Sequence, residues 1–494
     1  MKRKIILFII VFCFAIIITS PNFVPSHGLD SYCNMFTGYD ETAIWFLKKG
    51  RVLSALMFWI YGLINIPFDS VGFLSALGIN LCLSGAICVV YNYLSKNIEN
   101  KIVKLSILIL SFSMFYMPLM IEVVMFDEAM VMGFGVLMAV LCAKMIADGG
   151  WKKYLLAILF MIISVASYQG MACFLIPTLL LFESKKMYFE KNNKKSVLNV
   201  MKKIILALII YGIAFFFDLF IIKLIAFVLG DATSSVNNVN LLQNIRHIFT
   251  YLIPTSLKEL FGFIYPKVYY VITFVALCLA IFGLIKSDFK LINFLLLIGL
   301  ILSSVLMPFV PNIVMNSDEN YMAARTVLSL TILPSVICLF TIVKFDFDFK
   351  FFKYLVLIFG IIIVIIYSYL FYKNCSIDLN RYRQDIAYLS NLQSEISEYE
   401  NENNIKIKRI YWAKDVDSAY YYSTGYANGA NIRVMAEGWA MKCAVNDYIN
   451  FNKDVTYEEM SEKKYNELFK NKEYNYFDGK QLHFEGNSLY LLVY

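Results

Sequence analysis

Two groups of acidic residues lie beside apolar segments of this chain. Asp30, Asp40 and Glu41 follow the first apolar run, and Asp127 and Glu128 separate two later ones. Charge close to lipid is costly, so acids at the mouth of a membrane-length segment indicate a functional site. The distribution of basic loops, described below, puts both groups on the non-cytoplasmic side. We therefore expect them to form one shared site.

These acids could transfer a proton or bind a cation. A carboxylate held beside a hydroxyl group can act as a general base, and Asp30 and Asp40, with Glu41 next to it, are the candidate bases. Oxygen ligands from both groups could instead hold a divalent cation such as Mg²⁺ or Mn²⁺. Solvated loops without a chemical role are the alternative. The sequence has no Walker A, dinucleotide-binding or GxSxG pattern, so no other cofactor is indicated.

Two arginines and one polar interruption are candidate substrate-binding elements. Arg51 and Arg325 each adjoin an apolar run, and a guanidinium group can grip a phosphate with two parallel hydrogen bonds. For Arg325 the alternative is a side chain that reaches out to the membrane surface. Tyr168 and Gln169 interrupt the apolar stretch 154–182. Because buried polar groups need partners, we expect these two to contact a sugar or the neighbouring acids, or to pack between helices.

The composition indicates a protein that crosses a membrane many times. Of the 494 residues 59% are apolar and only 16% are charged, and the mean hydropathy is +0.63, which is too apolar for a soluble globular chain. The net charge of +7 comes from basic residues grouped in loops, as the positive-inside rule requires, with no continuous basic face for nucleic acid. The N-terminal MKRK and the apolar run after it predict an uncleaved first span with a cytoplasmic N-terminus.

The basic loops predict a topology of about eleven spans in the inner or plasma membrane. The loops assigned to the cytoplasm are 96–104, 144–153, 183–203, 286–290 and 344–353. The predicted spans are 5–20, 71–93, 105–121, 129–147, two short helices within 154–182, then 204–229, 269–285, 291–310, 326–343 and 352–372. Residues 52–66 are predicted to lie at the outer surface without spanning. A single span over 154–182 is the competing topology, and it would invert everything downstream.

The last part of the chain changes character. Residues 1–372 form the predicted membrane domain, and residues 373–494 are polar and predict a small extracytoplasmic α/β domain. Its predicted helices are 380–402 and 457–470, and its predicted strands are 406–413 and 488–494. Three cysteines fall in predicted external regions: Cys33, Cys375 and Cys443. Two of them could form a disulfide, which would leave the third free; the alternative is that all three are free.

Four short features together resemble a known family: Asp30, the Gly50-Arg51 pair, Asp127-Glu128, and Tyr168-Gln169-Gly170. The pattern resembles the bacterial O-antigen-modifying glucosyltransferases of the type II serotype-conversion family, which are membrane enzymes of the GT-C class. The resemblance covers roughly residues 20–340, and the tail matches no group we can name.

The resemblance implies a donor sugar, often glucose, carried on a polyprenyl phosphate such as undecaprenyl phosphate, and transfer to a cell-surface glycan on the outer face. It also implies an essential acid in the first external loop. The family's doubled acid is absent, because Ser31 follows Asp30. The Asp40-Glu41 pair resembles instead the acidic pair of protein O-mannosyltransferases, so the choice of base stays open.

We therefore expect a GT-C-like membrane glycosyltransferase with a lipid-linked donor, a glycan acceptor and no nucleic-acid partner. Asp30 or the Asp40-Glu41 pair would supply the base, and Arg51 and Arg325 would hold the lipid phosphate. Four other polar residues would line the site: Asp127, Glu128, Tyr168 and Gln169. Trp412 and Tyr420–Tyr422 could bind the acceptor by stacking or form a packing lid. A glycan flippase or transporter and a polysaccharide polymerase are the alternatives.

Overall fold

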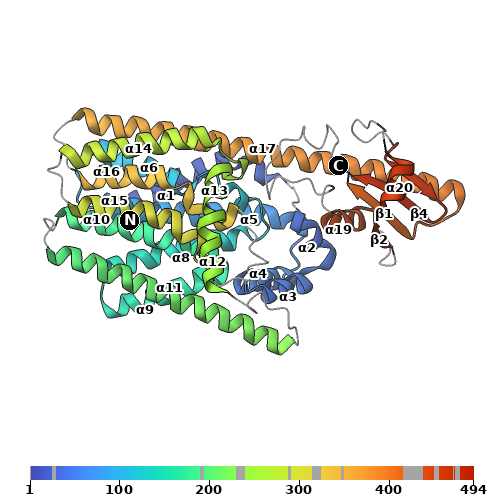
Figure 1. The fold of residues 1–494 in the computed structure, drawn as a ribbon, viewed down its shortest axis with the longest axis horizontal. Helices are drawn as coiled ribbons and strands as arrows, with labels where there is room; N and C mark the ends of the chain where they lie inside the picture. Colours follow the sequence, from blue (N-terminus) through green and yellow to red (C-terminus); the bar gives the residue numbers. More distant parts are fainter. Residues whose placement is uncertain are drawn as a thin grey trace.

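The computed structural model describes residues 2–24, 29–189, 194–229, 240–286, 291–313, 324–345, 350–414, 435, 438–449, 455–470, 472 and 479–493. A bundle of helices forms the larger part, and a small α/β domain lies beyond one end of it (Figure 1). One long helix, α17 (Lys350–Asn403), runs through the bundle and into the small domain (Figure 1). The expected helical membrane part with a small C-terminal sheet is confirmed.

Six helices of the described residues are long and apolar enough to cross a membrane. They are α5 (Phe68–Leu94), α8 (Ala129–Asp148), α11 (Lys194–Leu229), α14 (Pro266–Lys286), α15 (Leu291–Leu306) continued by the 3-10 turn η5 (Met307–Phe309), and α17. Shorter apolar helices complete the bundle: α1 (Lys2–Ile18), α6 (Lys101–Phe115) and α16 (Leu333–Lys344). The count of about eleven spans stays a prediction, because several predicted spans are shorter here. The span predicted at 326–343, for example, begins as the 3-10 turns η8 (Ala324–Thr326) and η9 (Leu328–Leu330).

The apolar stretch 154–182 is broken, as predicted. Helix α9 (Trp151–Ser167) ends where Tyr168 adopts an extended backbone, and the buried 3-10 turn η2 (Gln169–Phe174) leads into α10 (Leu175–Phe189). Irregular backbone between two apolar helices is tolerated here because protein encloses it. The predicted break between two helices is confirmed.

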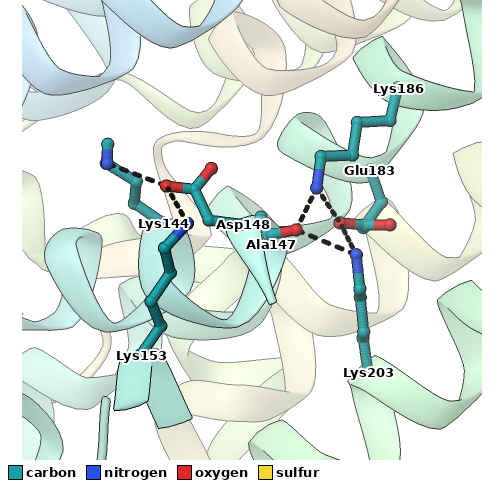
Figure 2. Close-up of polar contacts among 7 residues, drawn as sticks. All are labelled: Lys144, Ala147, Asp148, Lys153, Glu183, Lys186 and Lys203. Carbon is teal, nitrogen blue, oxygen red and sulfur yellow. Dashed lines mark hydrogen bonds and ion pairs between the residues drawn. The ribbon is translucent and has the colours of Figure 1, made fainter. Parts of the chain in front are cut away.

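Lysines gather at the end of the bundle where α8 and α10 finish (Figure 2). Lys186 and Lys203 both donate to the backbone carbonyl of Ala147 in the last turn of α8. The final carbonyls of a helix lack internal partners and attract cations, so these lysines cap α8. The ion pairs here are Lys203–Glu183 (2.9 Å), Lys186–Glu183 (3.9 Å), Lys144–Asp148 (3.0 Å) and Lys153–Asp148 (3.7 Å). The residues belong to the predicted cytoplasmic loops 144–153 and 183–203; parts of loops 286–290 and 344–353 lie outside the described residues.

Short helices cover the opposite end of the bundle (Figure 1). In chain order these are η1 (Ser20–Phe23), α2 (Leu29–Thr37), α3 (Tyr39–Lys48), α4 (Val52–Leu63), α7 (Met120–Val124), α12 (Leu241–His247), the π-turn η3 (Ile248–Leu252), α13 (Ile253–Glu259), and the 3-10 turns η4 (Leu260–Gly262) and η6 (Pro311–Ile313). With 12 residues, α4 is too short to cross a bilayer, which agrees with the non-spanning helix expected over 52–66.

The C-terminal domain contains a four-stranded sheet of order β2-β1-β4-β3. Its strands are β1 (Arg409–Lys414), β2 (Thr456–Glu459), β3 (Leu482–Glu485) and β4 (Ser488–Val493), and its helices are α19 (Gly438–Ile449) and α20 (Glu462–Leu468). Strand β1 runs parallel to β2 and β4, and β3 is antiparallel to β4. The strands predicted at 406–413 and 488–494 are confirmed.

The helix predicted over 380–402 is confirmed as the last part of α17, which also crosses the predicted boundary at 372/373. One prediction for this domain needs correction. The helix expected over 457–470 begins as strand β2, because these residues pair with β1. Helix α20 starts only after Ser461, whose hydroxyl accepts a hydrogen bond from the Lys464 backbone and caps the helix.

Helix α2 is docked into the C-terminal domain. Its Tyr32 is 1% exposed and packs in the core of that domain with Tyr388 and Leu389. A disulfide joins Cys33 to Cys443 on α19, and Cys375 is free and buried. The pairing of two of the three predicted external cysteines is confirmed, and the first acidic loop and the tail are covalently joined.

Serine at Cys33 should weaken this docking. Losing a native disulfide typically removes about 2–4 kcal/mol, so we expect Cys33→Ser and Cys443→Ser to unfold at lower temperature in detergent. The double variant should lose no more than either single variant, and Cys13→Ser, on the exposed face of α1, should behave like wild type. Free reaction of Cys33 and Cys443 with a maleimide before reduction would contradict the pairing.

Candidate active site

Arg51 is held at the junction of α3 and α4 by a buried acid and an aromatic ring. Gly50 before it has φ +75°, and a side chain there would collide with Ile222 of α11, so the turn requires glycine. The Arg51 Nη1 atom lies 3.1 Å from Glu128 Oε1, and the guanidinium lies 4.7 Å from the centre of the Tyr168 ring. Both contacts favour the cation, and together they hold the guanidinium at this junction.

Arg325 is held in the same manner by a different acid. Its Nη1 atom lies 2.6 Å from Glu122 Oε1 in α7, and its backbone N–H donates to Glu122 Oε2 at 2.8 Å. The guanidinium also lies 4.5 Å from the centre of the Phe126 ring. Glu122 is fully buried, so Arg325 is paired inside the protein. This geometry argues against the alternative of a side chain reaching to the membrane surface.

The Tyr168-Gln169-Gly170 motif connects these parts. Tyr168 stacks on Arg51, as described, and Gln169 Nε2 donates to Asp218 Oδ2 at 2.8 Å. Gly170 packs against the backbone carbonyl of Arg325, which a Cβ atom at this position would approach to 3.0 Å. The three residues therefore contact three separate parts of the chain: the start of α4, helix α11 and the turn η8.

Asp30 completes an electrostatic cluster with both arginines. It lies in the first turn of α2, where burial raises the pKa of its carboxyl against the lowering effects of Arg325 and Arg51. Burial likewise raises the pKa of Glu128 to about 7, opposed by Arg51 and reinforced by Asp30. Because each group acts on the others, the expectation that the two acidic groups meet in one site is supported for Asp30 and Glu128.

A cavity of about 630 Å³ adjoins the cluster on the side of the C-terminal domain. Its lining includes Asp30, Glu41 and Trp45 from the first acidic loop and Trp439 from α19. Its volume lies within the ~300–1,000 Å³ typical of ligand sites. Asp40 is exposed in the first turn of α3 and is not among the lining residues.

Asp127 does not line this cavity but contacts a residue that does. The lining residue Asn34 donates from Nδ2 to Asp127 Oδ2 at 3.3 Å, and Ser75 donates to the Asp127 backbone carbonyl. Asp127 is 7% exposed. It is therefore placed to orient Asn34, whereas Glu128 next to it faces Arg51.

Three buried polar atoms of the cluster have no hydrogen-bond partner among the described residues: Glu128 Oε2, Arg325 Nε and Asp218 Oδ1. Leaving such an atom unsatisfied costs about 1–3 kcal/mol, and native proteins rarely do so without a reason. Polar groups of a bound ligand would satisfy them. Within the described part of the chain, no group of three or more His, Cys, Asp or Glu side chains is arranged to hold a metal ion.

Sequence reasoning missed three residues of this site. Asp218 is an acid within an apolar run, a signal that could have marked it. Asn34 and Trp439 carry no such signal, because nothing in the sequence shows that α2 and α19 meet.

Two buried acids, one paired with an arginine and one with a lysine, should each contribute to the stability of the fold. Glu122→Gln and, at the opposite end of the bundle, Glu183→Gln each remove the anion from a buried pair, which typically costs about 3–5 kcal/mol. Since the pairs lie far apart, the losses should add in the double variant. Thermal unfolding in detergent measures both effects. Glu485→Gln, in an exposed pair with Lys464, should unfold at the wild-type temperature, and an equally small effect of Glu122→Gln would contradict the buried pairing.

Comparison with known proteins identifies the family of this chain. The model of the family described as "Glucosyl transferase GtrII" matches residues 22–342, which include every residue of the arginine cluster. No curated protein and no solved structure matches the chain. The match favours a transferase over the flippase and transporter alternatives, and it agrees with the resemblance to type II glucosyltransferases of O-antigen modification. The chain belongs to the GtrII glucosyltransferase family.

Proposed function

We propose that this glucosyltransferase moves glucose from a polyprenyl-phosphate carrier to a hydroxyl group of a cell-surface glycan on the outer face of the membrane. One observation carries the proposal. Arg51 and Arg325, each fixed by a buried acid, lie in one electrostatic cluster with Asp30, which also lines the adjoining cavity. Phosphate binding and proton removal can therefore take place side by side.

The two arginines are suited to a phosphate ester. Each guanidinium has five N–H donors, and the acids occupy only some of them: Arg325 Nε has no partner among the described residues. Fixed cations in a poorly hydrated site stabilise charge that develops on a leaving phosphate, because no reorganisation is needed during the reaction. The buried acids would hold the arginines ready for the donor.

An apolar groove beside the arginine cluster supports a lipid-linked donor. A cavity of about 400 Å³ lies between α4, α5 and α8, and its lining includes Leu56, Leu81 and Phe134. Helix α4 starts directly after Arg51, and α8 starts directly after Glu128. A donor with its phosphate at this ion pair could lay the first isoprene units of its tail along the groove.

The proposed reaction is a single displacement. The acceptor oxygen attacks the anomeric carbon, the bond from that carbon to the phosphate oxygen breaks, and Asp30 takes the proton of the acceptor hydroxyl. Configuration at the anomeric carbon inverts. Asp30 is favoured over Asp40 as the base because, of the two, Asp30 alone lines the cavity and interacts with the arginines.

Two features support the proposed orientation, with the site outside and the N-terminus in the cytoplasm. Disulfides persist in oxidising compartments, and the Cys33–Cys443 bond lies at the end of the bundle that carries the site. The lysine cluster around Ala147 (Figure 2) lies at the end of α8, whereas the site lies at the start of that helix. The positive-inside rule places the cytoplasm on the side of such lysines.

Asparagine at Asp30 should remove most of the activity. A general base contributes about 10²–10⁴-fold, so we expect Asp30→Asn to lower kcat by that factor, measured as glucose transfer from undecaprenyl-phosphate glucose in membranes. Burial raises the pKa of Asp30, so wild-type transfer should fall as pH drops through values above the ordinary aspartate pKa of about 3.9, because the base becomes protonated there.

Asp40→Asn is the matched comparison at equal expression. It should retain wild-type transfer, since Asp40 is exposed and does not line the cavity. Loss of transfer in Asp40→Asn with retention in Asp30→Asn would assign the base to Asp40. Full transfer in both variants would refute a first-loop base.

Tryptophan at Leu81 should fill the apolar groove. We expect Leu81→Trp to raise the KM for a long-chain polyprenyl donor, with little change for a short-chain donor whose tail does not reach the groove. Leu105→Trp is the control, because Leu105 is similarly exposed (46% against 41%) on α6, away from the groove. An unchanged KM for the long-chain donor in Leu81→Trp would show that the tail lies elsewhere.

A further inference from the structure

Two tryptophans from distant parts of the chain line the 630 Å³ cavity. Trp45 lies on α3 in the first acidic loop, and Trp439 lies on α19 in the C-terminal domain. Both side chains are substantially exposed, at 45% and 51%. Exposed indoles on two walls of one cavity are not explained by folding, since burial would stabilise each of them.

The position of Trp439 is fixed by its neighbours. The next residues of α19, Ala440 and Met441, are fully buried in the core of the C-terminal domain. Further along the same helix, Cys443 is bonded to Cys33 of α2. Trp439 is therefore presented to the cavity by a helix that is anchored through the residues directly after it.

Trp45 links this cavity to the arginine cluster. The Arg51 guanidinium lies 6.0 Å from the centre of the Trp45 ring, while the ring also lines the cavity. Asp30 lines the same cavity and interacts with Arg51. A molecule bound between the indoles would thus have Asp30 within the same enclosure, next to the proposed phosphate site.

We propose that Trp45 and Trp439 form the acceptor subsite, which binds a saccharide ring by stacking its apolar face on the indoles. The proposal rests on the proposed function and names the part of the chain that selects the acceptor. Polar side chains in the lining, among them Asn34, Glu41 and Lys48, can bond to sugar hydroxyl groups, as is usual where aromatic walls and a few polar groups share one pocket. The C-terminal domain, which lies beyond the residues matched by the family, would supply acceptor specificity to the bundle.

This subsite differs from the aromatic group predicted from the sequence. Trp412 is partly buried and packs against the core of the C-terminal domain, and it does not line the cavity. Tyr420, Tyr421 and Tyr422 lie outside the described residues.

Binding of the full chain in nanodiscs to surface polysaccharide extracted from cells that carry the gene tests the proposal independently of transfer. We expect Trp439→Ala to weaken binding by about tenfold and Trp439→Phe to retain much of it. In transfer assays, Trp439→Ala should raise the KM for the polysaccharide and leave the KM for undecaprenyl-phosphate glucose unchanged. Trp151→Ala, which removes a 68% exposed indole on α9, should match wild type in both assays.

The outcomes separate the two proposals. Wild-type binding in Trp439→Ala would overturn the acceptor subsite, and Trp439 would then belong to a packing lid. The proposal would also be overturned if Trp439→Ala lost binding only in protein that had lost the Cys33–Cys443 disulfide as well. The C-terminal domain would then have come undocked, and the loss of binding would not be due to the missing indole. Tryptophan-dependent binding without any glucose transfer by the wild type would support the subsite and refute the proposed donor.

Discussion

The structure depends on how two arginines are kept charged at a place largely shielded from water. An unpaired guanidinium there would cost several kcal/mol in lost hydration. Arg51 pairs with Glu128, which lies 77 residues after it in the chain. Arg325 pairs with Glu122, which lies 203 residues before it. These two pairs force the start of α4, helix α7, the start of α8 and the turn η8 to meet. Gly170 lies against the Arg325 carbonyl at this meeting point, and Gly50 lies against Ile222 of α11.

The lysine cluster at the other end of the bundle differs from the arginine pairs in how completely its polar groups are partnered. Around Ala147, two lysines satisfy a helix terminus and one buried acid, Glu183, and the arrangement is fully explained by helix capping. At the arginine end, Glu128 Oε2 and Arg325 Nε remain unpartnered within the described residues. Similar chemistry thus serves stability at one end and leaves binding capacity at the other.

The sequence predicts the candidate site from residues that apolar segments should not contain. Arg325 and Tyr168 stand out because polar groups in such runs need a reason, and the break at Tyr168 follows from loop parity. The partners could not be read in the same way. Whether Arg325 meets Glu122 or Asp127 depends on how helices pack, and both acids precede apolar runs. In the tail, local pattern favoured a helix over 457–470, but pairing with β1 outweighed it at Thr456–Glu459. Helix α17 continues across residue 372, where only the composition changes from apolar to polar.

Helix α2 makes the C-terminal domain a part of the site. The helix has nine residues, too few to be stable alone in water, and it carries Asp30, Tyr32 and Cys33 within one turn. Tyr32 is buried in the core of the C-terminal domain and Cys33 is bonded to it, while Asp30 interacts with the arginines. Any movement of the domain therefore moves the proposed base relative to the proposed phosphate site. A domain beyond the residues that the family matches would then set the geometry of the reaction, whatever part Trp439 plays in binding the acceptor.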